Sequence, residues 1–248
     1  MSWLNETLVG FDLETTGTDP AESRIVTAAL VEAKGGEVFR EQAWLADPGV
    51  PIPAEAAAIH GVSTERAVAE GRPAAEVADE VAAALCHHWR AGVPVVVFNA
   101  PFDLSLLEAE LARYGLAPLA ERLGGGRPGP VLDPLAIDRA VDKYRKGSRT
   151  LQSACAVYGV ELNGAHRAGN DALAALRVAL ALGRTYPAQV GDCEPADLHQ
   201  RQVDWYRDWA DGLQSWLRRS KDPAAVVDGS WPARRLPGAA DVPAPQRR

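Results

Sequence analysis

Residues 7–17 read TLVGFDLETTG, and this stretch decides the fold because it joins a buried strand to a pair of acidic residues. The apolar run over residues 7–13 is short and bounded by polar residues, which predicts a buried strand. Residues i and i+2 of a strand point to the same face, so Asp12 and Glu14 present both carboxylates together. Such close like charges are costly unless they are protonated or neutralised by a cation. A hard divalent metal suits carboxylate oxygens, although the pair alone also fits a solvated strand edge or a helix cap.

The size and composition of the chain set limits on its class. Its 248 residues suffice for one sizeable domain with appendages or for two small domains, and 47% hydrophobic residues can form a well-buried core. The net charge of -7 argues against a broad surface that coats nucleic acid, because such binding needs many Lys and Arg contacts to phosphate. A small, local phosphate site is compatible with that charge.

The three cysteines and the hydropathy pattern indicate a cytoplasmic protein. Cys86, Cys155 and Cys193 are scattered, with no CxxC pair and no zinc-finger histidine cluster, so we expect reduced thiols. The N-terminus lacks a basic region followed by a long apolar one, and no run of about 18 apolar residues occurs. We therefore expect neither secretion nor membrane insertion.

The order of apolar runs predicts an α/β fold with a mixed five-stranded sheet flanked by helices. The turn signal at residues 34–36 favours an antiparallel hairpin, and the strand at residues 93–98 is apolar on both faces, as when helices cover both sides of a sheet. The expected strands span residues 7–13, 24–32, 38–45, 93–98 and 130–135. The expected helices span residues 73–89, 104–114, 150–158, 170–182 and 202–217.

Beyond about residue 185 the character of the chain changes. The helix predicted over residues 202–217 carries an apolar stripe that needs a partner, either its own domain or a separate protein. The residues of the stripe are Trp205, Trp209, Leu213, Trp216 and Leu217. From residue 222 the chain is rich in Pro, Ala and Arg, which is typical of disorder. We therefore expect a main domain over residues 1–184, a helical extension packed on it over residues 185–221, and a disordered tail over residues 222–248.

Two further polar segments follow predicted elements. In residues 98–103 (FNAPFD), Asp103 stands where the central strand gives way to a helix, and strand ends of α/β sheets are where ligands bind. In residues 166–171 (HRAGND), Asp171 falls in the first turn of a strong helix and His166 lies on the loop before it. Each residue taken singly also has a structural interpretation, as a carboxylate at a helix N-terminus or as a surface imidazole.

Taken together, four motifs resemble the successive signatures of the DEDD exonucleases, in the subgroup whose last motif carries histidine. Within this subgroup, DEDDh, the sequence is similar to the epsilon proofreading subunit of bacterial DNA polymerase III. The motifs are residues 11–17 (FDLETTG), 59–62 (IHGV), 98–103 (FNAPFD) and 166–172 (HRAGNDA), and the resemblance spans residues 7–183. It implies a ribonuclease-H-like fold.

The resemblance also implies a role for each motif residue. Asp12, Glu14, Asp103 and Asp171 correspond to the ligands of two divalent ions, Mg²⁺ or Mn²⁺, and His166 to the general base. Two metals about 4 Å apart can hold both the attacking and the leaving oxygen of a phosphoryl displacement, and an imidazole can accept a proton near neutral pH. Substrate contacts are expected from Thr15, Thr16, Gly17, His60, Asn99 and Phe102. Of these, Phe102 would stack against the terminal nucleotide and Asn99 would secure its loop through hydrogen bonds.

The function implied is a metal-dependent 3′-to-5′ exonuclease that releases nucleoside 5′-monophosphates from single-stranded or frayed DNA 3′ ends, as in proofreading and repair. An RNA-trimming or oligoribonuclease activity is an alternative, because carboxylate-held metals do not read the 2′-hydroxyl. A second alternative is a non-catalytic module that accompanies a polymerase.

A basic run before the helix at residue 151 either contacts phosphate or forms a solvated face. Its residues are Arg139, Lys143, Arg145, Lys146 and Arg149.

Overall fold

Strand β1, Thr7–Thr15, runs through the middle of the sheet and separates two hydrophobic cores. The structure, a computed structural model, describes residues 2–234. Successive side chains of a strand point to opposite faces, so the odd-numbered apolar residues of β1 enter the core under α3 and α4, whereas Leu8 enters the core under α8. These helices are α3 (Ala74–Arg90), α4 (Ala100–Arg113) and α8 (Ala168–Thr185). Asp12 and Glu14 are in phase with Leu8, so both carboxylates lie on the α8 face.

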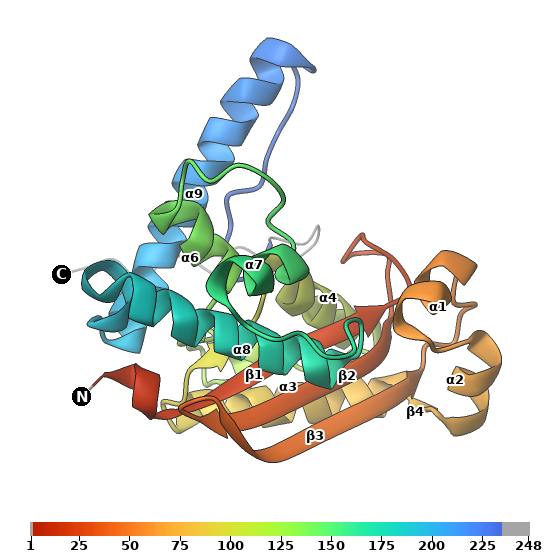
Figure 1. Cartoon of the computed structure of the whole chain (residues 1–248). Coiled ribbons are helices and arrows are strands. Elements are labelled where there is room, and N and C mark those ends of the chain that lie inside the picture. The colour runs from red at the N-terminus through yellow and green to blue at the C-terminus, as the bar shows by residue number, and fades with distance from the viewer. Residues whose placement is uncertain (1, 235–248) are drawn as a thin grey trace.

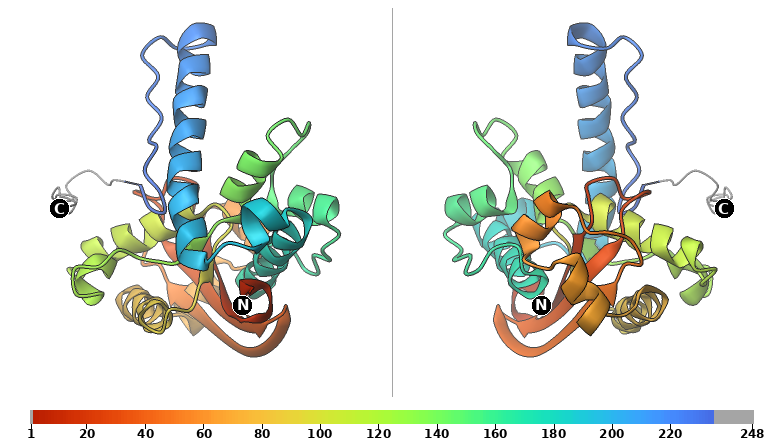
Figure 2. Two further views of the ribbon diagram at one scale, coloured as in Figure 1. Left: turned by 90° about the vertical axis from the view of Figure 1, so that its left-hand side faces the viewer. Right: turned by 90° about the vertical axis from the view of Figure 1, so that its right-hand side faces the viewer.

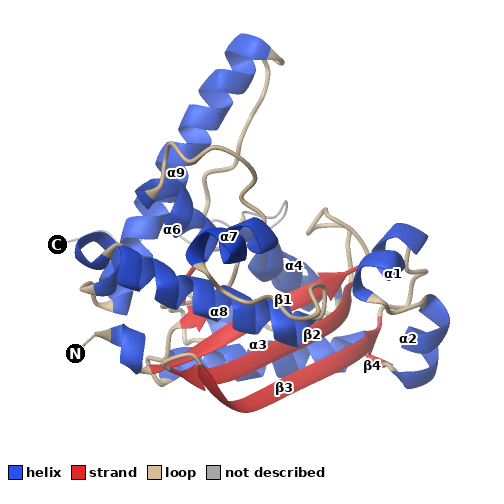
Figure 3. Cartoon of the chain, viewed as in Figure 1, coloured by secondary structure: helices blue, strands red, loops and turns tan. Residues whose placement is uncertain are grey.

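The sheet has six strands in the order β4-β3-β2-β1-β5-β6, with helices on both faces (Figures 1 and 3). The first three strands form an antiparallel meander, while β5 is parallel to β1 and β6 to β5. The remaining strands are β2 (Ile25–Lys34), β3 (Glu37–Asp47), β4 (Arg72–Pro73), β5 (Val95–Val96) and β6 (Val131–Leu132). The mixed α/β class is as predicted, but the expected five strands become six, because the short strand β4 pairs with β3 and is too brief to leave an alternating pattern.

The expected strand at residues 130–135 ends at Leu132, because a helix begins directly after it. Asp133 accepts hydrogen bonds from the backbone N–H of Leu135 and Ala136, and Pro134 occupies the first helical position. Both features favour a helix start. Helices α1, α2, α5 and α6 were not predicted. The remaining helical segments are η1 (Trp3–Asn5), α1 (Ala54–His60), α2 (Thr64–Glu70), α5 (Leu119–Arg122), α6 (Pro134–Val141), α7 (Leu151–Tyr158), the short π-helix η2 (Pro187–Gly191) and α9 (Pro195–Ser220).

Gly10 allows α8 to lie directly on β1. A Cβ atom at Gly10 would stand 2.4 Å from the carbonyl oxygen of Ala172, far inside a normal contact. The first turn of α8 therefore approaches the strand as closely as its backbone permits. Asp171 precedes Ala172 in this turn and is brought over the acidic end of β1.

Helix α9 covers the outer edge of the sheet, and its side chains make the hydrogen bonds to β6 that the backbone of a further strand would make. The amide of Gln202 donates to the carbonyl oxygen of Val131 at 3.0 Å and accepts from the N–H of Asp133 at 2.7 Å. His199 Nδ1 accepts from the N–H of Val131 at 3.0 Å. Strand β6 is thereby left without free backbone groups of the kind that make an open sheet edge prone to pairing with other chains.

Beyond Ala210 no residue of α9 is buried, and the helix projects from the body of the molecule (Figures 1 and 2). The predicted disorder of residues 222–248 is wrong for residues 222–234, which run back along the helix. Trp231 is only 7% exposed and joins the core, and burial of a large aromatic side chain offsets the cost of ordering this Pro- and Ala-rich segment. Residues 235–248 of the expected tail lie outside the described residues.

The apolar stripe of α9 is covered only in part. Trp205 and Trp209 are half-buried against the two cores, whereas Trp216 on the projecting half is 46% exposed. The return segment contacts this half through polar groups: the N–H of Val227, for example, donates to Gln214 Oε1 at 3.0 Å. The helix therefore packs on its own domain through its first half alone.

Cys86, Cys155 and Cys193 form no disulfide in the described chain. Over residues 2–234 no helix combines the length and the apolar character that a membrane crossing requires.

We predict that Gly10→Ala lowers the free energy of unfolding by about 1–3 kcal/mol, the usual cost of overpacking a core. The added methyl group must push the first turn of α8 away from β1. The control is Gly212→Ala on α9, where nothing beyond the backbone of the helix itself lies within 4 Å of the new Cβ. Because alanine favours a helix, this change should raise stability slightly, by up to about 1 kcal/mol. Equal denaturant midpoints for Gly10→Ala and the parent protein would contradict the close approach.

Candidate functional site

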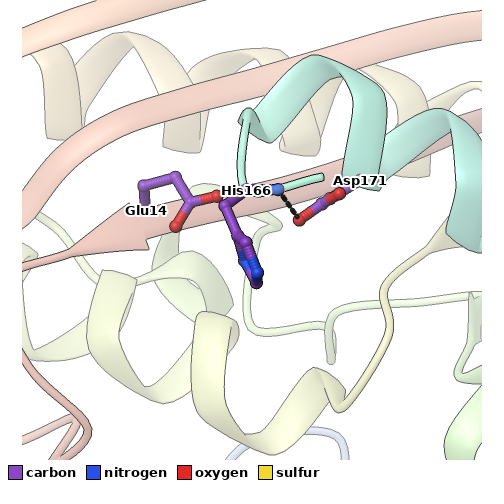
Figure 4. Close-up of side chains that lie close together, drawn as sticks. All are labelled: Glu14, His166 and Asp171. Atoms are coloured by element: carbon purple, nitrogen blue, oxygen red, sulfur yellow. Dashed lines mark hydrogen bonds between the residues drawn. The ribbon is translucent and has the colours of Figure 1, made fainter. Parts of the chain in front are cut away.

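Side chains from two separate segments meet at the carboxyl end of β1 (Figure 4). Glu14 lies on the strand, Asp171 in the first turn of α8, and His166 on the loop before that helix. One potential ligand atom from each of the three side chains lies within 4.8 Å of the other two. The strand and the last motif predicted from the sequence are therefore adjacent in space.

Asp103 joins this group from the other side of the strand. Its Oδ1 accepts a hydrogen bond from the backbone N–H of Leu13 at 3.0 Å, which ties the first turn of α4 to β1 between Asp12 and Glu14. The Asp103 side chain is buried, as its residue is only 4% exposed. The charges of Asp103, Glu14 and Asp171 all act on Asp12, so the fourth carboxylate that the motifs single out lies near the other three, although only Glu14 and Asp171 belong to the 4.8 Å group with His166.

Burial raises the pKa of every carboxyl group in the cluster, and repulsion by acidic neighbours adds to this for Asp12, Glu14 and Asp103. Burial, and then the charges of Asp103, Glu14 and Asp171, hold the pKa of Asp12 well above its ordinary value of 3.8. Burial raises the pKa of Glu14 from 4.5 to about 7, with the charge of Asp171 adding to the effect. The pKa values of Asp103 and Asp171 are also raised by burial, although the backbone hydrogen bonds that these groups accept act in the opposite direction. Such a cluster favours either a bound proton or a bound cation.

The donor set fits a divalent cation. Within residues 2–234, no Lys or Arg side chain forms an ion pair with any of the four carboxylates. Asp171 Oδ1 is buried and has no hydrogen-bond partner in this part of the chain, so its lone pairs are left to another ligand. Carboxylate oxygens are the ligands that hard cations such as Mg²⁺ and Mn²⁺ prefer.

The loop before α8 is held by Asp171 itself. His166 has a left-handed backbone, with φ of +65°, and its N–H donates to Asp171 Oδ2 at 3.0 Å. This hydrogen bond occupies the backbone of His166 and leaves the exposed imidazole free to act beside the carboxylates.

Asp133 fixes the start of α4 and was missed by the sequence analysis. Its two carboxylate oxygens accept hydrogen bonds from the N–H of Asn99 at 2.9 Å and of Ala100 at 3.1 Å. The expected role of Asn99 in securing this loop therefore falls to its backbone, which has a left-handed φ of +68°. The signal that could have identified Asp133 is its position after an apolar strand and before Pro134, which is typical of a helix cap.

A cavity of about 450 Å³ opens beside the cluster. It is lined by Asp12 and Asp103 on the acidic side, and Asn99 and Phe102 also border it. The lining residues also include Leu135, Arg139, Ser148, Arg149 and Thr150. Two arginines of the basic run predicted from the sequence thus reach the same cavity as the carboxylates.

The turn after β1 has an internal hydrogen-bond network. Thr15 Oγ1 donates to the carbonyl oxygen of Gly17 at 2.7 Å. Thr16 donates through its N–H to the carbonyl oxygen of Arg24 and accepts from the N–H of Arg24 through its hydroxyl. The imidazole of His60 lies near the Thr15 backbone, and burial lowers the pKa of this histidine. In the structure Thr16 thus has a supporting role, while the expected substrate contacts of this turn stay predictions.

Residues 9–179 match the exonuclease family RNase_T. The DNA polymerase III PolC-type protein of Halalkalibacterium halodurans is 30% identical over 170 residues, which are 68% of this chain and 11% of that protein. The DNA polymerase III subunit epsilon-like protein of Rhodobacter capsulatus is 36% identical over 141 residues, which are 54% of this chain and 18% of that protein. The chain therefore spans less than a fifth of the length of these two relatives.

Solved structures with the same fold include exonucleases. The zinc-ion-bound complex of E. coli exonuclease I with single-stranded DNA has a TM-score of 0.63 at 19% identity, over 85% of this chain and 45% of that chain. Exonuclease I from Methylocaldum szegediense has a TM-score of 0.58 at 22% identity, over 85% of this chain and 45% of that chain. These likenesses confirm the predicted fold class.

We predict that the metal-free protein loses thermal stability as the pH rises from about 4.5 to about 7. The folded-state pKa of Glu14, about 7, lies above the ordinary value of 4.5, so the folded protein holds a proton that the unfolded chain releases in this window. The stability that this proton contributes is therefore fully present below about pH 4.5 and is lost as the pH rises through about 7. Each loss of about 1 kcal/mol in the free energy of unfolding lowers the melting temperature of a domain of this size by roughly 2–4 °C. The melting temperature should therefore fall by several degrees.

Glu14→Gln is the matched control, because it removes this titrating group while other buried acids remain. The decline measured in EDTA should be smaller in this variant. Saturating Mg²⁺ or Mn²⁺ should restore the melting temperature of the parent protein at neutral pH, since a cation bound only to the folded state stabilises it. A parent protein whose melting temperature at pH 7 does not respond to either metal would contradict the proposed metal binding.

Proposed function

Because the chain belongs to the exonuclease family RNase_T, we propose that it is a metal-dependent 3′-to-5′ exonuclease acting on the 3′ ends of single-stranded or frayed DNA. Its products would be nucleoside 5′-monophosphates. The observation that carries the proposal is the convergence of four buried or half-buried carboxylates and one free imidazole at the end of β1. A binding module without catalysis would have no need for so costly a cluster.

The proposal of DNA as the substrate is supported by the two relatives described above, which are DNA polymerase III proteins. It is also supported by the solved exonuclease I complex with single-stranded DNA. RNA stays the alternative, and the test below separates the two. We further propose a replication or repair polymerase as a partner and the cytoplasm as the location, on the strength of the same relatives.

Asp12, Glu14, Asp103 and Asp171 would hold two divalent ions, Mg²⁺ or Mn²⁺. When bound, the ions would supply positive charge at the scissile phosphate and favour ionisation of the attacking water. The protein's part is to keep the four carboxylates close together in a partly buried site. Hydrogen bonds from the backbone of Leu13 and of the loop before α8 fix the orientation of two of them.

His166 would act as the general base. An imidazole nitrogen is a common general base in proteins, and the backbone hydrogen bond of His166 to Asp171 holds this residue beside the cluster. The exposed position lets the proton pass on to solvent after each turnover. Phe102 would contact the base or sugar of the terminal nucleotide in the cavity, and the turn at Thr15 would contact its backbone.

We predict that Asp12→Ala abolishes cleavage without unfolding the protein, because it removes a ligand from the cluster but no hydrogen bond that holds β1 to its neighbours. His166→Ala should lower the rate by about 10²–10⁴, the usual contribution of general acid–base catalysis. It should leave metal-induced stabilisation in place. The assay uses matched DNA and RNA oligonucleotides, labelled at either the 5′ or the 3′ end, in Mg²⁺, Mn²⁺ and EDTA.

The pattern of products tests each part of the proposal. Shortening of the 5′-labelled strand in single-nucleotide steps, with immediate release of a labelled mononucleotide from the 3′-labelled strand, establishes the direction. Circular single-stranded DNA is the control for internal cleavage and should stay intact. The ratio of DNA to RNA rates decides the substrate. Normal turnover by Asp12→Ala, or release of the 5′ label first, would overturn the proposal.

A further inference from the structure

A second cavity, of about 510 Å³, lies between α6 and the first half of α9. One wall is basic and comes from α6 and the loop that follows it, and the other is aromatic and comes from α9. The residues that give the two walls their character are Arg139, Lys143, Arg149, Trp205, Tyr206 and Trp209. We call this cavity the α6–α9 groove.

The α6–α9 groove adjoins the cavity beside the acidic cluster. Arg139 and Arg149 line both, so they stand at the junction between the acidic cluster and the aromatic wall. A linear ligand whose end lies beside Asp12 and Asp103 can therefore extend past the two arginines towards α9. The motif resemblance does not include this helix, which follows residue 183.

The guanidinium group of Arg139 stacks on Trp209 and has free hydrogen-bond donors in the described chain. Its guanidinium carbon lies 3.9 Å from the centre of the Trp209 ring, an arrangement that fixes the position of the side chain. Over residues 2–234 the guanidinium makes no hydrogen bond or ion pair, so its N–H donors are available. Arginine N–H groups in this state match the oxygens of a phosphate. By contrast, Arg149 is already paired with Asp138.

The groove differs in charge from the rest of the molecule. The chain carries a net charge of -7, yet three cationic residues line the groove against a single acidic one, Asp208. Lys143 is exposed and forms no ion pair within the described chain, so its full charge faces solvent. Aromatic side chains next to unpaired cations are the combination that binds single-stranded nucleic acid, with bases against rings and phosphates against cations.

We propose that the α6–α9 groove binds the part of a single nucleic-acid strand that lies on the 5′ side of the nucleotide being removed. The inference rests on the proposed function, because it takes the 3′ end of the strand to lie beside the carboxylates. Arg139 contacts a phosphate at the junction, Lys143 contacts a further one, and Trp205 receives a base. A protein segment is a poorer match, since the wall opposite the aromatic residues is cationic and opens into a site built for phosphate. Helix α9 thereby extends the binding surface beyond the catalytic domain.

The test measures binding in EDTA, so that no strand is cut and the result does not depend on hydrolysis. Fluorescence anisotropy with labelled dT10 and dT2 compares a strand that can reach the groove with one that fits the catalytic cavity. The variants are Arg139→Gln and Lys143→Gln in the groove, with Arg207→Gln as the matched control. Arg207 is an exposed arginine of α9 that does not line the groove.

We expect dT10 to bind the parent protein more tightly than dT2, and each groove variant to weaken dT10 binding by about three- to tenfold at low salt. Loss of one phosphate contact should also reduce the slope of log affinity against log salt by about 0.7 for a single strand. Arg207→Gln should change neither quantity. A duplex of the same length should bind more weakly, since paired bases cannot stack on the tryptophans.

Several outcomes would overturn the inference. These are equal weakening by all three variants, equal affinity for dT2 and dT10, or unchanged binding of dT10 by both groove variants. Because Lys143 is exposed, its variant keeps the test valid even if Arg139→Gln does not fold. The same titration with rU10 identifies the source of the strand: tighter binding of dT10 assigns the groove to DNA, and tighter binding of rU10 to RNA. A protein that binds dT10 through the groove but cleaves nothing would contradict the proposed function alone.

Discussion

Repulsion among the four carboxylates at the end of β1 is the constraint on which the rest of the site depends. Burial withholds from Asp12 the water that would otherwise screen its charge, and its three acidic neighbours raise the pKa further. Without a proton or a cation, the folded state is under electrostatic strain at neutral pH. We infer that this strain is retained because a divalent cation relieves it. The positive charge of the same cation would then also attract a phosphate bound at this place.

The surrounding fold holds the charged groups together against this repulsion. Gly10 lets α8 lie on the strand, which brings Asp171 over its end. Asp133 accepts hydrogen bonds from the N–H groups at the start of α4, and Asp103 accepts one from the N–H of Leu13. Each of these contacts joins segments that are far apart in the sequence. The site is therefore a product of packing across the whole sheet rather than of one loop.

The sequence was sufficient to predict the acidic cluster but not its supports. Asp12 and Glu14 could be placed on one face because the period of a strand is fixed. Asp103, Asp171 and His166 were assigned to the same site only by the resemblance of the four motifs to the DEDD exonucleases. Gln202 could not be predicted to complete the sheet edge, since a side chain that substitutes for a strand leaves no periodic signal. The order of residues 222–234 was missed for a related reason. Composition predicts disorder there, while the burial of Trp231 depends on a core assembled elsewhere.

The most direct measurement of the central claim is a calorimetric titration of Mn²⁺ into the metal-free protein, repeated in two buffers of different ionisation enthalpy. The account predicts saturable binding of two ions per chain with release of protons near pH 6.5, because Glu14 with a pKa of about 7 must give up its proton to bind a metal. It also predicts that proton release shrinks as the pH rises above that value. Absence of saturable binding, or binding without proton release at the lower pH, would contradict the claim that these carboxylates are gathered to hold metal.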